Sequence, residues 1–374
     1  MKTRPNRIIT PLVRDIQGEL KESTWEEALS VIVRKVSGKK TAGIVSSRLP
    51  VETLNVFRNF IKRAAGGGAI DTTDGEIFRA ISSGMNKNQG LFDDEGTVKD
   101  IAAADYILLV GADPQSTNPV VSTVIRRTVN KTKAKLTIIN EKADVLPLWS
   151  YLWLNPTKDS EALVIKGIIK CIVSNKWNKV GPGSTMENEL ETIDLETVTR
   201  MSEVSKADLE IIARDYSQAK NPFIIYGVKL LSSDVSAVTG LATLAAVTGN
   251  SKGFLSLKPA ANSRGAWEMG LAEGIMEKPQ GLYLLLGDDT PDEYLLKRIE
   301  GLDYLVVQAS HRSHAVEKAD VVLPSPIWAE KSGSYITLDG RLVKSHSVLK
   351  PMDTIKQDAE ILAMIAEKLG YKIN

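Results

Sequence analysis

Four short apolar runs of this sequence end in small or polar residues that could bind a ligand. The six candidate binding residues that follow these runs are Gly111, Asp113, Ser116, Asn140, Gly227 and Gly287. In a parallel sheet they lie beyond the carboxyl ends of the strands, where backbone N–H groups and helix N-termini favour anions. The alternative is that the glycines make tight turns and the polar residues cap helices, since no loop carries G-x-G-x-x-G or G-x-x-x-x-G-K-[ST].

The sequence offers few residues for metal or nucleophilic chemistry. His311 and His314 are spaced so that two imidazoles could share one helical face, but a zinc site of three imidazoles would also need His346, the only other histidine. Cys171, the single cysteine, lies in an apolar helical run where a small buried residue is expected. We therefore predict no catalytic residue and no metal ligand on this chain.

Periodicity and turn residues predict an α/β chain in which strands and helices alternate. The predicted strands are 42–46, 105–111, 136–139, 151–154, 223–226, 282–286, 304–307 and 321–323. The predicted helices are 25–36, 51–65, 118–129, 159–173, 207–219, 236–247 and 359–369. Ser23 and Glu26 have the spacing of a capping box for the first helix. Residues 66–99 are expected to form a long loop with short helical pieces, and 174–205 a polar surface connection.

The composition narrows the class of protein. With 374 residues, 43% hydrophobic and 25% charged, the chain is long enough for about two globular domains. The 47 Lys and Arg are balanced by 46 Asp and Glu, which argues against nucleic-acid binding. One cysteine cannot ligate an iron-sulfur cluster, which needs about four thiolates, so any cluster is expected on a partner. No signal-peptide pattern and no apolar run of roughly 20 residues is visible, so we expect a cytoplasmic protein without a membrane span, alone or in a membrane-associated complex.

Five blocks of the sequence, taken in order, resemble the molybdopterin oxidoreductase superfamily. This group includes formate dehydrogenases, nitrate reductases and the large iron-sulfur subunit of NADH:quinone oxidoreductase (complex I). The matching blocks are 4–28, 60–71, 110–127, 262–270 and 319–341. The last block is the most specific and contains Ala319-Asp-Val-Val-Leu-Pro324, Trp328-Ala-Glu-Lys331 and Asp339-Gly-Arg341. The resemblance covers nearly the whole chain and is closest in character to the complex I subunit and to formate dehydrogenase alpha subunits.

The resemblance also implies a domain organisation. The fold would consist of two doubly wound α/β domains with mostly parallel sheets, one inserted in the other. Residues 1–62 and 215–374 would form one discontinuous domain, and 63–214 would form the insertion. Family members also carry an N-terminal iron-sulfur domain and a C-terminal pterin domain, and we expect this sequence to lack both.

The sequence departs from the family where active members bind their metal. Those members hold molybdenum or tungsten through two pterin dithiolenes and a Cys, selenocysteine, Ser or Asp side chain. The matching segment here, 71–90, contains neither Cys nor His, although Asp71, Ser82 or Ser83 could substitute. The segment 140–142 reads Asn-Glu-Lys, where many active members have Asp-Pro-Arg for the nucleotide end of the pterin.

These departures favour a non-catalytic scaffold subunit of a multisubunit NADH- or formate-linked electron-transfer complex. This hypothesis expects no cofactor on the chain itself and places iron-sulfur clusters and flavin on partner subunits. The alternative is a split formate or formylmethanofuran dehydrogenase subunit that binds a molybdenum or tungsten pterin guanine dinucleotide, with its missing parts supplied in trans. The six candidate residues would line the pterin cleft of such a subunit, or its vestige in a scaffold. A free-standing nucleotide-binding protein is a third hypothesis.

Overall fold

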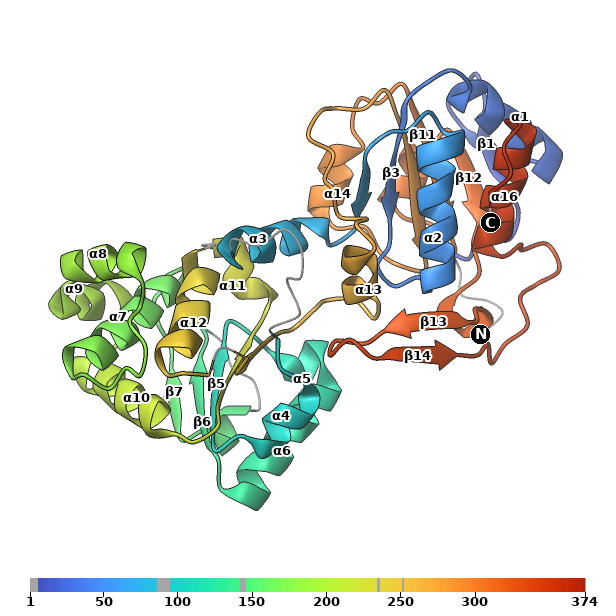
Figure 1. Ribbon diagram of the computed structural model, residues 1–374. Coiled ribbons are helices and arrows are strands. Elements are labelled where there is room, and N and C mark those ends of the chain that lie inside the picture. The colour runs from blue at the N-terminus through green and yellow to red at the C-terminus, as the bar shows by residue number, and fades with distance from the viewer. Residues whose placement is uncertain (1–5, 86–94, 142–145, 234–235, 251, 374) are drawn as a thin grey trace. The chain divides into compact units, whose positions relative to one another are not determined.

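The chain forms two compact units (Figure 1). The computed structural model describes residues 6–85, 95–141, 146–233, 236–250 and 252–373. The first unit comprises Met1–Glu76 and Ala260–Asn374, and the second comprises Ile77–Pro259. Helix α3 (Gly75–Met85) begins at the end of the first unit and continues in the second, so the second unit is an insertion in the first.

A seven-stranded sheet forms the core of the first unit, in the order β2-β1-β12-β11-β10-β3-β4. Its strands are β1 (Leu12–Arg14), β2 (Leu20–Glu22), β3 (Thr41–Val45), β4 (Ile70–Thr72), β10 (Gly281–Gly287), β11 (Tyr304–Ala309) and β12 (Val321–Pro324). Neighbouring strands are parallel except at β1, which pairs antiparallel with both of its neighbours. The helices are α1 (Trp25–Val36), α2 (Val51–Asn59), α13 (Ser263–Glu268), α14 (Glu293–Arg298), α15 (His314–Lys318) and α16 (Asp358–Lys368). A separate antiparallel hairpin joins β13 (Gly333–Ile336) to β14 (Leu342–Ser345).

The second unit contains a five-stranded, fully parallel sheet in the order β7-β6-β5-β8-β9. Its strands are β5 (Tyr106–Val110), β6 (Lys135–Ile139), β7 (Leu152–Leu154), β8 (Pro222–Tyr226) and β9 (Phe254–Ser256). Its remaining helices are α4 (Val98–Ala103), α5 (Pro114–Thr117), α6 (Pro119–Thr132), α7 (Glu161–Ser174), α8 (Ser184–Thr192), α9 (Leu195–Ser202), α10 (Lys206–Gln218), α11 (Val228–Ser233) and α12 (Ser236–Val247). Helices α4 and α6 lie on one side of the sheet, and α7, α10 and α12 lie on the other (Figure 1). The predicted α/β class with doubly wound, mostly parallel sheets is confirmed.

The segments predicted as irregular contain more regular structure than their sequences indicated. Strand β4 and helix α3 fall within 66–99, helix α4 begins there at Val98, and helices α8 and α9 fall within 174–205. These elements are short, so packing stabilises them more than their own propensity does. Helix α1 is capped by Thr24 and Glu27, one residue later than predicted, because the Thr24 hydroxyl accepts from the Glu27 N–H.

The limits of the insertion differ from the predicted 63–214. Strand β8 pairs with β5, and β9 pairs with β8, so both belong to the sheet of the second unit. The contact between these strands keeps the chain in the second unit as far as Pro259. Strand β4 pairs with β3, which keeps residues 63–76 with the first unit.

The sheet of the first unit is packed so closely at β10 that one position requires glycine. Gly281 lies against the Tyr304 ring, and a Cβ at Gly281 would fall 1.9 Å from Tyr304 Cζ. The ring cannot easily move away, because the Tyr304 hydroxyl is 2.6 Å from Thr41 Oγ1 on β3 and both residues are buried. Three neighbouring strands are therefore fixed together at this point.

We expect Gly281→Ala to destabilise the chain by about 1–3 kcal/mol, the usual cost of overpacking a core. Urea unfolding followed by circular dichroism measures the change. The matched control is Gly181→Ala, where the nearest atom to the new Cβ would be a Glu187 carboxylate oxygen at 3.6 Å. Equal midpoints for the two variants would contradict this account of the packing.

Candidate functional site

The strand order of the second unit reverses beside its central strand. From β5 the chain proceeds through β6 to β7 in one direction, and it then adds β8 and β9 on the other side of β5. Open parallel sheets bind ligands at such a topological switch point, beyond the carboxyl ends of the two flanking strands. The flanking strands here are β5 and β8, and they end immediately before Gly111 and Gly227.

The two loops at this switch point touch each other. The Gly227 N–H donates to the Val110 carbonyl at 3.1 Å. A Cβ at Gly227 would lie 2.7 Å from both the Gly111 carbonyl oxygen and Ala112 Cβ. Gly111 itself has φ +55°, and a Cβ there would lie 2.9 Å from Leu230 Cβ. Both positions therefore require glycine so that the loops can approach.

Asp113 and Ser116 follow Gly111 at the start of helix α5. Asp113 caps this helix, with one carboxylate oxygen accepting from the Gln115 N–H at 3.1 Å. The other carboxylate oxygen accepts from the exposed Ser116 hydroxyl at 2.6 Å. The helix-capping role considered for these residues is therefore present in the fold, and it holds the Asp113 carboxylate beside the switch point.

Asn140 supports the same loop from the neighbouring strand. Its side chain is buried, and Nδ2 donates to the Ala112 carbonyl at 3.2 Å. Its own carbonyl accepts from Trp153 Nε1 at 3.2 Å. The Asn140 amide thus binds the loop after β5 rather than a ligand. Of the segment 140–142, Lys142 lies outside the described residues.

Gly287 belongs to a different switch point, in the first unit. There the strand order reverses between β3 and β10, and Gly287 ends β10. The Ser46 hydroxyl, just after β3, donates to Asp289 at 2.7 Å, which joins the two strand ends. The structure therefore brings together five of the six candidates, and Gly287 marks the corresponding position of the other sheet.

A buried ion pair that the sequence analysis missed lies next to Gly287. Lys331 Nζ is 2.6 Å from an Asp358 carboxylate oxygen, and both side chains are at most 4% exposed. The other Asp358 oxygen accepts from Gln308 Nε2 at 2.7 Å and from the Ser325 hydroxyl at 2.5 Å. A Cβ at Gly287 would lie 2.8 Å from Lys331 Nζ. The sequence feature that could have indicated this pair was Lys331, which lies in 319–341, the most specific of the five blocks that resemble the family.

A second missed pair lies at the carboxyl end of β9 in the second unit. Lys258 Nζ is 2.5 Å from a Glu95 carboxylate oxygen, with both side chains at most 2% exposed. The Lys258 carbonyl lies 3.4 Å from Asn118 Nδ2, at the start of α6. A charge this deeply buried needs a partner, because an unpaired charge is expensive to desolvate. The sequence signal that could have indicated this pair was a lysine two residues after a short buried strand.

Two of the three residues considered as substitutes for a metal ligand, Asp71 and Ser82, are buried. Asp71 is fully buried, and its carboxylate accepts from Arg298 at 2.8 Å and from the Thr72 N–H at 2.9 Å. Ser82 and Ser83 lie on α3, the first buried and the second exposed. Residues 86–90 lie outside the described residues. Asp71 therefore forms an ion pair in the core of the first unit rather than presenting a carboxylate for a metal.

Asp74 is a further buried carboxylate of the segment 71–90. It accepts hydrogen bonds from the hydroxyls of Ser47, Thr72 and Ser263 and from Trp267 Nε1. Burial raises the pKa of Asp74, and these four donors oppose that rise. Because the donors come from the end of β3, from β4 and from α13, Asp74 connects three elements of the first unit.

Of the three histidines, His311 lies near Gly287, because its Nδ1 is 2.8 Å from the Ser310 hydroxyl and the Ser310 N–H donates to the Gly287 carbonyl at 2.7 Å. His311 forms an isolated bridge with Arg7, His314 begins α15 and contacts Glu317 at 3.2 Å, and His346 is exposed after β14. Within the described ranges, no group of three or more His, Cys, Asp or Glu is arranged to hold a metal ion. Cys171 is buried in α7. Among the described residues, no helix is long and apolar enough to cross a membrane.

Comparisons with known proteins identify one matching sequence family and several relatives. The sequence model of the molybdopterin oxidoreductase family matches residues 7–368. The F420-dependent formate dehydrogenase subunit alpha of Methanocaldococcus jannaschii is 26% identical over 98% of this chain and 62% of its own. The NADPH-Fe(3+) oxidoreductase subunit alpha of Geobacter sulfurreducens is 24% identical over 98% of this chain and 50% of its own. The chain thus spans about half to just under two thirds of these relatives.

A solved structure gives the same result for the fold. The acetylene hydratase of Pelobacter acetylenicus superimposes with a TM-score of 0.77, covering 99% of this chain and 62% of that chain. Its sequence identity to this chain is 14%, so the likeness concerns the fold alone. The family match contradicts the expectation that this chain carries no cofactor, because the family is named for molybdopterin. That expectation, which rested on missing thiols, was wrong.

We expect Asn140→Asp to destabilise the chain by about 1–3 kcal/mol, because it removes the donor to the Ala112 carbonyl and buries a carboxylate without a partner. Chemical unfolding measures the loss. The matched control is Asn178→Asp, which removes a similar Nδ2 bond to the Val180 carbonyl in an exposed loop. If both substitutions had the same small effect, Asn140 would not support the loop.

We also expect Cys171 to resist thiol reagents in the folded chain. Burial raises the pKa of Cys171 to about 11, with the Glu210 carboxylate adding to the rise. At pH 8 only about one thiol in a thousand is then ionised, and the thiolate is the reactive form. Ellman's reagent should label one thiol per chain only after denaturation. A Cys171→Ala, Ser37→Cys variant, with its thiol on the surface, should label at once; rapid labelling of native Cys171 would contradict the burial.

Proposed function

Because the chain belongs to the molybdopterin oxidoreductase family, we propose that it binds the dinucleotide end of a molybdopterin cofactor at the switch point of its second unit. The observation that supports this site is the contact between Gly111 and Gly227, which brings two strand-end loops together where the strand order reverses. Asp113 stands beside them and accepts from the N–H and hydroxyl groups of α5. Gly287 marks the corresponding switch point of the first unit and is not part of this site.

The residues at these points fit the organic part of such a cofactor. Strand-end loops with backbone N–H groups suit phosphate oxygens, and a carboxylate such as Asp113 suits the hydroxyl and amino groups of a nucleotide. Asn140 positions the loop by its bond to the Ala112 carbonyl. When bound, the cofactor would supply a molybdenum or tungsten centre for two-electron redox chemistry. The chain's own residues would bind and orient the dinucleotide.

In the described part of the chain, neither Asp71 nor Cys171 is placed to serve as a protein ligand for the metal. Asp71 Oδ2 forms an ion pair with Arg298 Nη1 at 2.8 Å, and Cys171 is buried in a helix of the second unit. A soft metal centre needs a ligand placed close to it. We therefore propose that the chain is the alpha-type subunit of a split, formate dehydrogenase-like oxidoreductase. Other chains would supply the missing ligand, the iron-sulfur clusters and the flavin.

A second candidate is a non-catalytic subunit that retains the fold for assembly. The specific observation in its favour is the Asp71–Arg298 ion pair. Asp71 could have replaced the metal ligand, but its carboxylate binds Arg298 instead. The two candidates differ in whether the native complex oxidises formate with electrons passing through this subunit. Formate-dependent reduction of a dye by the complex favours the split enzyme, and cofactor content without turnover favours the non-catalytic subunit.

The binding site is tested by the cofactor content of the natively purified protein. We expect near-stoichiometric pterin with molybdenum or tungsten, measured by metal analysis and by fluorescence of the oxidised pterin. Gly227→Ala should lower the content roughly tenfold, equivalent to about 1.4 kcal/mol, because its Cβ separates the two loops.

Gly181→Ala is the control for the same change in an exposed loop, and thermal melting shows that both variants fold. Full pterin content in Gly227→Ala would mean that the dinucleotide binds elsewhere. Native complex without pterin or metal would refute the proposed function.

A further inference from the structure

The hairpin of β13 and β14 is a two-stranded sheet that is separate from the seven-stranded sheet (Figure 1). Its strands pair antiparallel, with Tyr335 opposite Val343 and Ser334 opposite Lys344. In such a pair, alternate residues of each strand direct their N–H and C=O groups toward the partner strand, and the others direct them outward. A two-stranded hairpin therefore has two outer edges whose backbone groups need other partners.

Side chains of the same unit occupy the outer edge of β13. The Ser334 N–H donates to a Glu52 carboxylate oxygen at 2.8 Å. The Ile336 N–H donates to Asn262 Oδ1 at 2.9 Å, and Asn262 is fully buried. The backbone N–H and C=O groups of Ser334 and Ile336 thus point away from β14. Those of Tyr335, between them, point toward β14.

The opposite edge of β14 follows from this alternation. Tyr335 and Val343 form a hydrogen-bonded pair, and the bond from the Thr337 N–H to the Arg341 carbonyl at 2.9 Å continues the same pattern. The residues between the bonded positions, Leu342 and Lys344, therefore direct their N–H and C=O groups outward. These two residues present the backbone groups of a strand edge to the surroundings.

The side chains of β14 are exposed on both of its faces. Leu342 is 64% exposed and Val343 is 40% exposed, although successive side chains of a strand point to opposite faces. Val348, three residues after β14, is 73% exposed, and Trp328, which precedes the Ala329 that binds the Val348 N–H, is 66% exposed. Natural proteins seldom leave an apolar strand with an open edge, because it invites pairing with another chain. We propose that the outer edge of β14 accepts a β-strand of a partner polypeptide that carries acidic and apolar side chains.

The charge around β14 identifies the chemistry of the partner. Lys344 is the one cation within β14 itself, while the flanking Arg341 and Lys350 pair with Asp339 at 3.1 Å and with Asp353 at 3.5 Å. A second copy of β14 would bring no carboxylate to Lys344, and in the antiparallel register that places Lys344 opposite Lys344 the two like charges would repel each other. An incoming strand with Asp or Glu at alternate positions would instead face Lys344. The partner is therefore a different chain rather than a second copy.

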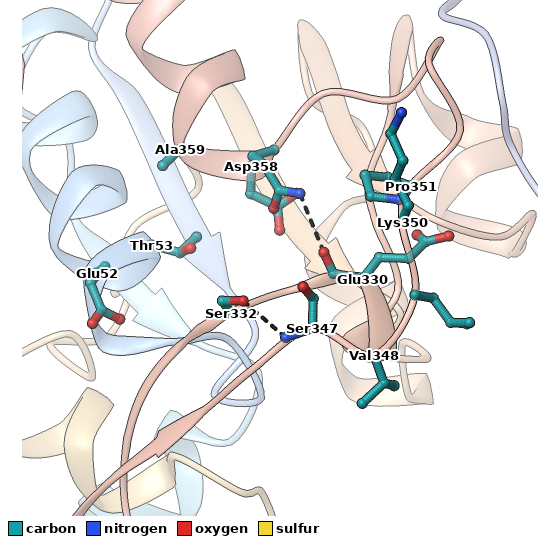
Figure 2. Close-up of a pocket in the computed structure, with 12 residues that line it drawn as sticks. Glu52, Thr53, Glu330, Ser332, Ser347, Val348, Lys350, Pro351, Asp358 and Ala359 are labelled. Carbon is teal, nitrogen blue, oxygen red and sulfur yellow. Dashed lines mark hydrogen bonds between the residues drawn. The ribbon is translucent and has the colours of Figure 1, made fainter.

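The edge is also fixed in place before any partner binds. The Ser347 N–H, two residues after β14, donates to the Ser332 hydroxyl at 2.9 Å (Figure 2). Val348 and Leu349 then both donate to the Ala329 carbonyl at 2.9 Å. This segment forms one wall of a cavity of about 570 Å³, which Figure 2 shows beside Thr53. A preformed edge loses little conformational freedom on binding, which favours strand addition.

Amide hydrogen exchange at single-residue resolution tests this proposal. In the isolated chain, the N–H groups of Leu342 and Lys344 should exchange fast while those of Val343 and Ser345 are protected by β13. In the complex purified from its native source, all four should be protected, with exchange at Leu342 and Lys344 slowed at least tenfold. This outcome is independent of whether the complex contains a pterin, so it separates the interface from the proposed function.

Two substitutions of Lys344 separate the contribution of its backbone N–H to partner binding from the contribution of its charge. Lys344→Pro removes an outward N–H that β13 does not use, and Lys344→Glu reverses the charge that faces the partner. Each should reduce the co-purified partner at least fivefold, whereas Lys99→Glu, at an exposed lysine of α4, should not. Thermal melting shows that the hairpin unit remains folded.

Binding of a synthetic strand provides the direct measurement. A labelled peptide of alternating Glu and Val should bind the wild-type chain, and the same peptide with Lys in place of Glu should bind at least tenfold more weakly. Fast exchange at Leu342 and Lys344 in the native complex, or a native chain that elutes alone, would overturn the proposal. Concentration-dependent dimers with the same protection would show that a second copy occupies the edge instead.

Discussion

The second unit depends on the close approach of the two loops that follow β5 and β8. The strands are in parallel register, with Val110 opposite Tyr226, so their loops leave the sheet next to each other. Gly227 then lies so near Ala112 that any side chain at this position would collide with it. This contact holds Asp113 beside Gly227 where the strand order reverses. The proposed dinucleotide site therefore rests on a steric requirement that glycine satisfies.

Buried charges fix the ends of the strands in both units. Lys258 pairs with Glu95 after β9, and Lys331 pairs with Asp358 beside Gly287. Such pairs contribute little net stability, but removing one partner leaves a costly uncompensated charge. They therefore specify one arrangement of the loops. Asp71 follows the same rule through its bond to Arg298, and this explains why a residue able to bind a metal is engaged in the core instead.

The outer edge of β13 attaches the hairpin to its own unit, and the outer edge of β14 is the proposed binding edge. Glu52 and Asn262 satisfy the outer N–H groups of β13 and join the hairpin to its own unit. The outer groups of β14 point away from that attachment, and its side chains are exposed on both faces. The hairpin thus keeps the outer edge of β14 available. An alpha-type subunit that obtains parts from other chains would need an attachment surface of this kind.

The sequence by itself determined the strands and the loops that matter, because an apolar run followed by glycine is a local pattern. Gly111, Gly227 and Gly287 were found in this way, periodicity predicted the α/β class, and five resembling blocks indicated the family. Tertiary structure decided which strands are neighbours, and hence that Gly111 and Gly227 meet while Gly287 belongs to the other sheet. It also decided the extent of the insertion to Pro259, the partner of Asp71 and the open edge of β14. Each of these depends on contacts between residues far apart in the chain, which local propensity and periodicity do not encode.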